Sequence, residues 1–260
     1  MHVVTFTRST PDTAAKVWVN EEGEVTWGDV ATVVNPWDEY SLEETIAQAK
    51  IFGGESTAIA IGAELHNDAL KHSMAMGIKN VLRVDEVGVD TGDSLVWSAL
   101  AAGAIRKLGD VDLIIFGKES VDVGSDQHSY QLARRLGWTM LSYVSAIIET
   151  DYTAGTIKVE KMLEQGKQIV SANLPAVVSV MKGINEPRYP NFLGIRKAAK
   201  AQIPVWSAAD LGVDTPAAAT RALRYMNPPA RDISTEIIAG ADLEEKAAVL
   251  ADRLFEEKVL

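Results

Sequence analysis

The loop Gly117–Gln127 combines the residue types that could bind an anionic ligand. It follows the apolar run Val111–Phe116 and leads into a segment with helical spacing. In an open α/β sheet, ligands bind at the carboxyl ends of the strands, where the N–H groups of a helix N-terminus attract phosphate. Gly117 and Gly124 would let the backbone approach a phosphate closely. A plain connection between strand and helix, capped by Asp126, fits the spacing equally well.

The loop Asn35-Pro36-Trp37-Asp38 is a second candidate binding segment. Its tryptophan stands beside a proline, ahead of a helical segment, where the ring could stack on a planar ligand. A tryptophan that fills the edge of the core is the alternative, and the chemistry alone slightly favours it.

The stretch Asn185–Lys197 is a candidate docking segment. Phe192 and Leu193 lie in a region rich in Pro, Asn and Gly, and basic residues flank them in an otherwise acidic protein. Exposed apolar residues with basic neighbours are typical of a docking surface. The alternative is a loop whose phenylalanine packs inward. The docking candidates are Arg188, Tyr189, Phe192, Leu193, Arg196 and Lys197.

Several other chemistries lack support in the sequence. The chain has no cysteine, which excludes disulfides, Cys-ligated metals and thiol catalysis. The histidines have no metal-ligand spacing, so no metal site is expected. The loop Gly117–Gln127 is neither a Walker A nor a GxGxxG motif, and no GxSxG elbow occurs. We therefore assign no catalytic residues.

The composition is that of an acidic globular protein. The 260 residues carry a net charge of −11, so nucleic acid, which binds clustered Lys and Arg, is not an expected partner. The N-terminus lacks the basic and apolar pattern of a signal peptide, and no apolar run approaches the ~20 residues that span a bilayer. We expect a cytoplasmic protein without direct membrane insertion.

Strand and helix patterns alternate over the first half of the chain. Ser41 and Glu44 form a capping box, which predicts that a helix starts at Ser41. Asp93 or Ser94 is expected to cap a long helix that ends at Gly109. This rhythm predicts an α/β fold with a doubly wound, mostly parallel sheet. The expected strands are His2–Thr7, Thr57–Ile61, Asn80–Val84 and Val111–Phe116.

The pattern changes after about residue 140. Amphipathic runs separated by turns at Tyr143–Glu149, Thr156–Met162 and Lys167–Ala172 predict an antiparallel hairpin extension of the sheet. Beyond residue 204 the chain contains several prolines and then a final helix with apolar residues on one face. We therefore divide the chain into an α/β domain, 1–204, and a C-terminal arm, 205–260, that ends in a helix.

Two segments, Asn185-Glu186-Pro187-Arg188-Tyr189 and Ile195-Arg196-Lys197-Ala198, closely resemble the signature of electron-transfer flavoprotein beta subunits. Other parts of the chain resemble the same family in the same order, namely Asn35-Pro36, the loop Gly117–Gln127, Leu174–Val178 and Asp210–Val213. The resemblance implies a nucleotide-binding α/β domain and a C-terminal arm that packs on a partner, the alpha subunit.

The resemblance also implies cofactors and roles. This chain would hold AMP or a second FAD, while the alpha subunit of the heterodimer would hold most of the redox FAD. A flavin-dependent dehydrogenase would donate electrons to a downstream quinone reductase or other acceptor. Trp37 falls near the alpha-bound flavin, and Phe192 falls at the anchor of the loop that docks on dehydrogenases. The expected cofactor-binding residues are Phe6, Asn35, Trp37, Ile61, Gly62, Asp93, Ser94, Gly117, Lys118, Val121, Val123, Gly124, Asp126, Gln127 and His128.

Two alternatives stay open. The segment Thr91–Ser98 partly resembles the G-A-D-T-L-A-T-S stretch of electron-bifurcating members, in which a second FAD in the beta subunit oxidises NADH; Asp93 and Ser94 belong to this stretch. The alternative from another class is a stand-alone nucleotide-binding regulatory protein. Such regulators lack the antiparallel hairpins and the C-terminal tail expected here.

Overall fold

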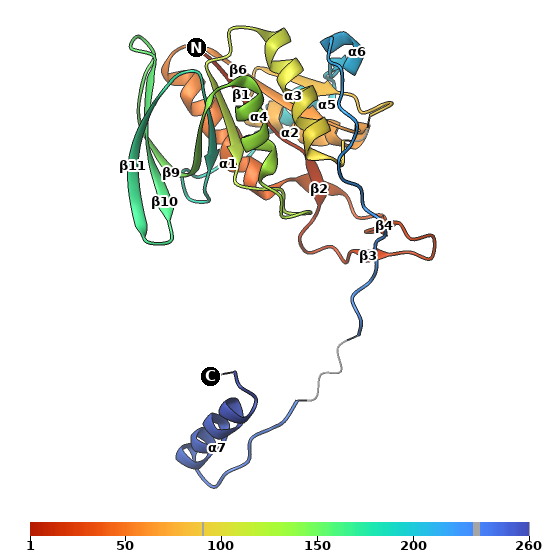
Figure 1. Cartoon of the computed structure of the whole chain (residues 1–260), viewed down its shortest axis with the longest axis vertical. Coiled ribbons are helices and arrows are strands. Elements are labelled where there is room, and N and C mark those ends of the chain that lie inside the picture. The colour runs from red at the N-terminus through yellow and green to blue at the C-terminus, as the bar shows by residue number, and fades with distance from the viewer. Residues whose placement is uncertain (90, 231–234, 260) are drawn as a thin grey trace. The chain divides into compact units, whose positions relative to one another are not determined.

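The computed structural model describes residues 1–89, 91–230 and 235–259 (Figure 1). The chain divides into two compact units, Met1–Tyr225 and Met226–Leu260. Residues 205–225, which the sequence analysis placed in the arm, therefore make most of their contacts within the first unit. Residues 231–234 and 260 of the predicted arm lie outside the described residues. No helix in the described part of the chain is both long and apolar enough to cross a membrane.

The first unit is built on a large sheet. Within the described residues, its strands follow the order β11-β10-β9-β12-β8-β1-β6-β7-β13. β1 lies in the interior of the sheet and runs parallel to both neighbours, β6 and β8. The doubly wound, mostly parallel sheet that the sequence predicts is thus confirmed. The parallel strands are β1 (His2–Phe6), β6 (Glu55–Ile61), β7 (Asn80–Val84), β8 (Leu113–Gly117), β12 (Ala176–Val180) and β13 (Val205–Trp206).

The predicted antiparallel extension is also present. β9 (Thr139–Asp151) begins parallel to β12 and then pairs antiparallel with β10 (Thr156–Leu163), which pairs with β11 (Gly166–Asn173). One long strand thereby joins the parallel sheet to the hairpin. Two small separate sheets pair β2 (Ser9–Pro11) with β5 (Thr32–Val34) and β3 (Trp18–Val19) with β4 (Val25–Thr26).

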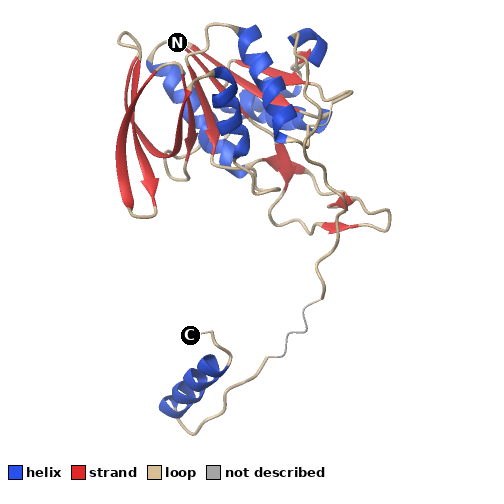
Figure 2. Ribbon diagram, in the orientation of Figure 1, coloured by secondary structure: helices blue, strands red, loops and turns tan. Residues whose placement is uncertain are grey.

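Helices cover both faces of the parallel strands (Figure 2). α1 (Pro36–Ile51) and α2 (Asn67–Met76) pack over one face, where Leu42 and Leu70 join a buried cluster with Ala58 of β6. α3 (Ser94–Leu108) and α4 (Gln127–Leu136) cover the other face, against Val4 and Phe6 of β1. The remaining helices are η1 (Glu64–His66), α5 (Phe192–Ala199), α6 (Ala208–Leu211) and α7 (Leu243–Glu256).

The start of α1 corrects one expectation. The helix begins at Pro36, with Asn35 as N-cap, and not at Ser41. Proline suits the first helical position because its fixed φ is already helical and its missing N–H would have no partner there. Ser41 is buried inside the helix, where its hydroxyl donates to the carbonyl of Asp38. By contrast, Asp93 caps α3 as expected.

Candidate functional site

A cavity of about 930 Å³ opens at the carboxyl ends of β1 and β8. The chain order reverses between these two strands, because β6 and β7 follow β1 on one side while β8 and β12 lie on the other. Ligands of open α/β sheets bind at such a switch point. The volume lies within the range of roughly 300–1,000 Å³ that small-molecule and cofactor sites occupy.

Most residues predicted for the cofactor site line this cavity. They come from the carboxyl ends of three neighbouring strands, from the start of α3, and from the loop between β8 and α4, which the strand order brings together. The predicted residues in the lining are Phe6, Asn35, Ile61, Ser94, Gly117, Lys118, Val121, Val123, Asp126, Gln127 and His128.

Four other residues predicted for the cofactor site are not part of the lining: Trp37, Gly62, Asp93 and Gly124. Trp37 lies in the first turn of α1, and its ring centre is 5.0 Å from Nζ of Lys118. Gly62 and Gly124 have positive φ angles of 133° and 61°, so they shape turns beside the cavity. The carboxylate of Asp93 is occupied by backbone and hydroxyl groups of the chain itself.

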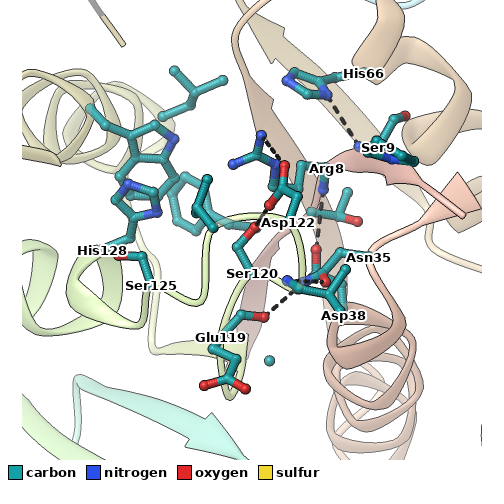
Figure 3. Close-up of a pocket in the computed structure, with 18 of the residues that line it drawn as sticks. Arg8, Ser9, Asn35, Asp38, His66, Glu119, Ser120, Asp122, Ser125 and His128 are labelled. Atoms are coloured by element: carbon teal, nitrogen blue, oxygen red, sulfur yellow. Dashed lines mark hydrogen bonds and ion pairs between the residues drawn. The ribbon is translucent and has the colours of Figure 1, made fainter. Parts of the chain in front are cut away.

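Asn35 connects the loop Gly117–Gln127 to the start of α1 (Figure 3). Its side-chain amide donates to Oδ1 of Asp38 at 2.8 Å and to the carbonyl of Glu119 at 3.0 Å. Its Oδ1 accepts the N–H of Val121 at 3.1 Å. A Cβ added at Gly117 would lie 2.6 Å from the backbone of Trp37, so the two segments approach as closely as glycine allows. Asn35 therefore positions the loop that lines the cavity.

Arg8 also lines the cavity and offers a guanidinium to an anion, although it was not among the residues predicted from the sequence. Its guanidinium pairs with Asp122 at 2.9 Å, and Asp122 also accepts a hydrogen bond from Ser120 (Figure 3). Nε of Arg8 is buried and has no hydrogen-bond partner within the described chain. Nε is thus shielded from the cavity, but the Arg8 side chain is 34% exposed, so the outer part of its guanidinium can reach a ligand oxygen. Arg8 could have been selected from the sequence because it closely follows the predicted end of β1, where ligands of α/β sheets bind.

Two histidines lie in the same lining, the buried His66 and the half-buried His128. Nδ1 of His66 accepts the N–H of Ser9 at 3.1 Å, which fixes the neutral tautomer with its proton on Nε2. Burial, and after it the charge of Arg8, lowers the pKa of His66 and of His128 to about 4. Both rings are neutral near pH 7, so Arg8 supplies the positive charge beside them.

An aromatic wall forms the opposite side of the cavity. The ring of His128 stacks on Trp97 with centres 4.2 Å apart, and Phe6 contacts both Trp97, at 5.1 Å, and Phe116, at 5.0 Å. All four residues line the cavity. Flat apolar rings of this kind suit a planar heteroaromatic ligand. Trp97 and Phe116 were not predicted, because their spacing fits an ordinary core position.

The N-terminus of α4 lacks the side-chain cap that α3 has. Asp126 is the N-cap residue of α4, but its side chain accepts no N–H from the first turn. Its Oδ2 instead accepts the hydroxyl of Tyr143 at 3.2 Å. The first-turn residues Gln127, His128 and Ser129 line the cavity. This helix end can therefore offer backbone N–H groups to an anion.

The predicted docking segment divides into an anchored part and an exposed part. Arg188 makes two hydrogen bonds to the carboxylate of Glu43, at 2.6 and 2.7 Å, which fixes the segment on α1. Phe192 and Leu193 are 77% and 76% exposed at the start of α5, so the phenylalanine does not pack inward. Tyr189, Arg196 and Lys197 are exposed as well.

Comparisons with known proteins agree with this architecture. Residues 27–211 match the electron transfer flavoprotein domain. Protein FixA of Azotobacter vinelandii is 29% identical over 83% of this chain and 78% of its own. The caffeyl-CoA reductase-Etf complex subunit CarD of Acetobacterium woodii is 26% identical over the whole of both chains. The electron transfer flavoprotein subunit beta of Clostridium acetobutylicum is 27% identical over 99% of each. The chain belongs to the electron transfer flavoprotein family, among its beta subunits and FixA proteins.

Proposed function

We propose that this electron transfer flavoprotein beta subunit holds an adenine nucleotide in the cavity at the switch point, while an alpha subunit holds the redox FAD. The observation that carries the proposal is the division of the cavity into an aromatic side and an anion-binding side. A nucleotide has the same division, since a planar base is linked to a charged phosphate.

The anion-binding side suits a phosphate. The side chain of Arg8 is 34% exposed in the cavity lining, and the first turn of α4 has no side-chain cap. Guanidinium groups and helix N-termini are both strong phosphate binders. Arg8 would bind the phosphate, while Asp122 orients the guanidinium from its other side.

The aromatic side suits a base or a flavin ring. Trp97 and His128 lie face to face, and Phe6 closes the base of this wall on β1. When bound, a flavin supplies the redox chemistry, and the residues of this chain orient it and exclude water. The chain's own side chains need no catalytic group for this role.

The composition of the purified heterodimer tests this proposal. The protein is denatured, and the released nucleotides are separated and counted per heterodimer. One FAD and one AMP would establish a carrier with a structural nucleotide in this chain. A heterodimer that retains one FAD and no second nucleotide would contradict the assignment of the cavity.

A second candidate is the electron-bifurcating type, in which this cavity holds a second FAD that oxidises NADH. The observation that favours it is the volume of about 930 Å³, which is near the upper end for such sites. Thr91, Ser94 and Trp97, from the segment that resembles bifurcating members, line the same cavity. Two FAD per heterodimer, together with reduction by NADH, would establish this version.

The exposed start of α5 is the proposed contact for a flavin-dependent dehydrogenase that donates electrons. Phe192 and Leu193 offer an apolar anchor, and Arg196 and Lys197 lie one turn later on the same short helix. A quinone reductase or another acceptor would then take the electrons from the heterodimer. The alternative of a stand-alone regulator is disfavoured by the family assignment and by the hairpin β10–β11, which such regulators lack.

A further inference from the structure

A segment after β13 follows the outer side of α3 toward the cavity. Nζ of Lys107, near the end of α3, donates to the carbonyl of Asp210 at 2.8 Å. In the middle of the helix, a Cβ added at Gly103 would collide with the side chain of Val213. At the helix start, Asp93 bonds to residues 219 and 220. We call residues 207–225, which run antiparallel to α3, the strap.

Asp93 joins the strap to the start of α3 through its two oxygens. Oδ1 caps the helix by accepting the N–H groups of Leu95 at 2.7 Å and Val96 at 3.3 Å. Oδ2 accepts the N–H of Ala219 at 3.0 Å and both the N–H and the hydroxyl of Thr220 at 2.7 Å. The residue is only 1% exposed. Both oxygens are therefore committed, and no side-chain oxygen is left for a ligand.

The charge on Asp93 strengthens this contact. The hydrogen bond from the Thr220 hydroxyl, followed by those from backbone N–H groups, lowers the pKa of Asp93 to about 2. The carboxylate is thus ionised at neutral pH, and hydrogen bonds to an ionised acceptor are stronger than neutral ones. The strap between α6 and Tyr225 has no helix or strand of its own.

The end of the strap forms part of the cavity. Thr220 and Tyr225 belong to the lining, on the same rim as Thr91 and Ser94. We propose that Asp93 is a positioning residue that fixes the strap at the rim of the cavity, where Thr220 and Tyr225 cover the bound nucleotide and slow its release. This inference rests on the proposed nucleotide site.

Three variants distinguish the two roles of Asp93, which are to cap α3 and to hold the strap. Asp93→Ser keeps a residue that caps helices well but lacks the second oxygen that holds the strap. Thr220→Val removes one hydrogen bond to Oδ2 and leaves α3 untouched. Thr215→Val is the matched control, because the Thr215 hydroxyl makes no hydrogen bond to any described residue. All are prepared as heterodimers with the alpha subunit.

Two measurements are made on each heterodimer. Hydrogen–deuterium exchange over residues 217–225 shows whether Asp93 holds the strap, since the N–H groups of Ala219 and Thr220 are bonded to Asp93. The rate at which AMP or FAD leaves this chain after dilution shows whether Thr220 and Tyr225 cover the nucleotide. We expect faster exchange and about tenfold faster release in Asp93→Ser, as for the loss of one or two net hydrogen bonds. Thr220→Val should show a smaller change of the same kind, and Thr215→Val none.

Each other outcome is decisive. Faster exchange with unchanged release would overturn the inference, because the strap would be tethered without covering the ligand. Unchanged hydrogen–deuterium exchange in Asp93→Ser would also overturn the inference, because it would show that Asp93 does not hold the strap in place. A wild-type heterodimer without nucleotide in this chain would refute the proposed function itself. If the wild type and Asp93→Ser both hold the nucleotide and release it at the same rate, only the role of the strap is refuted.

Discussion

Arg8 and Lys118 are the basic residues in the described lining of the cavity, beside several carboxylates. Burial keeps the two neighbouring histidines neutral, because a second positive charge beside a guanidinium in a desolvated site would be unfavourable. Burial also raises the pKa of Asp38, behind the loop, to about 7. These groups make the stability of the protein depend on pH in opposite directions.

The first prediction concerns His128. An unfolded histidine takes up a proton below about pH 6.5, whereas the folded His128 does so only near 4. Its contribution to stability is therefore present above 6.5 and is lost as the pH falls toward 4. His128→Phe keeps a ring against Trp97 and removes this dependence. The melting temperature of the variant should fall less than that of the wild type between pH 7.5 and pH 5.

Asp38 provides the control of opposite sign. The unfolded carboxyl loses its proton above about 3.8, whereas the folded one keeps it until about 7. Its contribution is therefore full below 3.8 and is lost as the pH rises through 7. Asp38→Asn should make the melting temperature fall more steeply on acidification. Equal pH profiles in the wild type and both variants would contradict this assignment of the buried charges.

The second prediction concerns Gly124. Its φ of 61° is rarely adopted by side-chain-bearing residues, so valine there costs about 1–3 kcal/mol of strain or forces the loop to move. Gly124→Val should lose the nucleotide of this chain while the heterodimer keeps the FAD of the alpha subunit. Gly155→Val is the matched control, since Gly155 has a φ of 67° in the distant β9–β10 turn. Equal nucleotide content in both variants would argue against the loop assignment.

At the scale of elements, the sequence predicted the sheet and most of its helices, because the hydrophobic periods are local and strong. The prediction placed the start of α1 too late. The capping box at Ser41 and the proline at position 36 both mark a helix start, and the sequence alone does not show which of the two is used. Asp93 was expected to contact the cofactor. Its actual partner, Thr220, lies 127 positions along the chain, a distance over which periodicity carries no information.

Among the missed residues, Arg8 and His66 follow the ends of β1 and β6 closely, so strand ends were the usable signal. Trp97 differs, because its place on the buried face of α3 is what any core residue would have. Its role at the cavity follows only from the stacked ring of His128 on the neighbouring helix.

The third prediction concerns α5. Phe192 is 77% exposed, and truncating an apolar anchor of this kind typically costs about 2 kcal/mol of binding, or roughly thirtyfold in affinity. Phe192→Ala should therefore weaken electron transfer from the dehydrogenase by about that factor. Chemical reduction of the FAD and the melting temperature should stay unchanged, because the ring supports no core.

Ile51→Ala is a suitable control for this variant, since Ile51 is 67% exposed at the end of α1. Arg196→Ala and Lys197→Ala should slow association mainly, with effects that shrink as salt rises. Arg188→Ala should instead destabilise the segment, because its guanidinium is bonded to Glu43. Equal losses in dehydrogenase-driven and chemical reduction by Phe192→Ala would show that α5 is not the docking element.

At the scale of the whole molecule, the described residues of the second unit, Met226–Leu260, form no buried core of their own. α7 has no buried residue among those described, and Leu243, Leu250 and Phe255 are 84%, 47% and 64% exposed. A helix of this length is marginal alone in water and needs an apolar surface to pack on. We therefore propose that this unit is the part of the arm that packs on the alpha subunit.

The last prediction follows from that arrangement. A chain that ends after Tyr225 keeps the sheet, the cavity and the bonds between Asp93 and Thr220, so it should still fold with a cooperative melting transition. It should nevertheless fail to form a stable heterodimer, because the alpha subunit loses the apolar face of α7. Sedimentation of the mixed subunits measures this directly, and Leu250→Asp in the full chain should weaken the heterodimer without shortening it. A truncated chain that assembles with the alpha subunit as tightly as the full chain would show that the interface lies on the first unit alone.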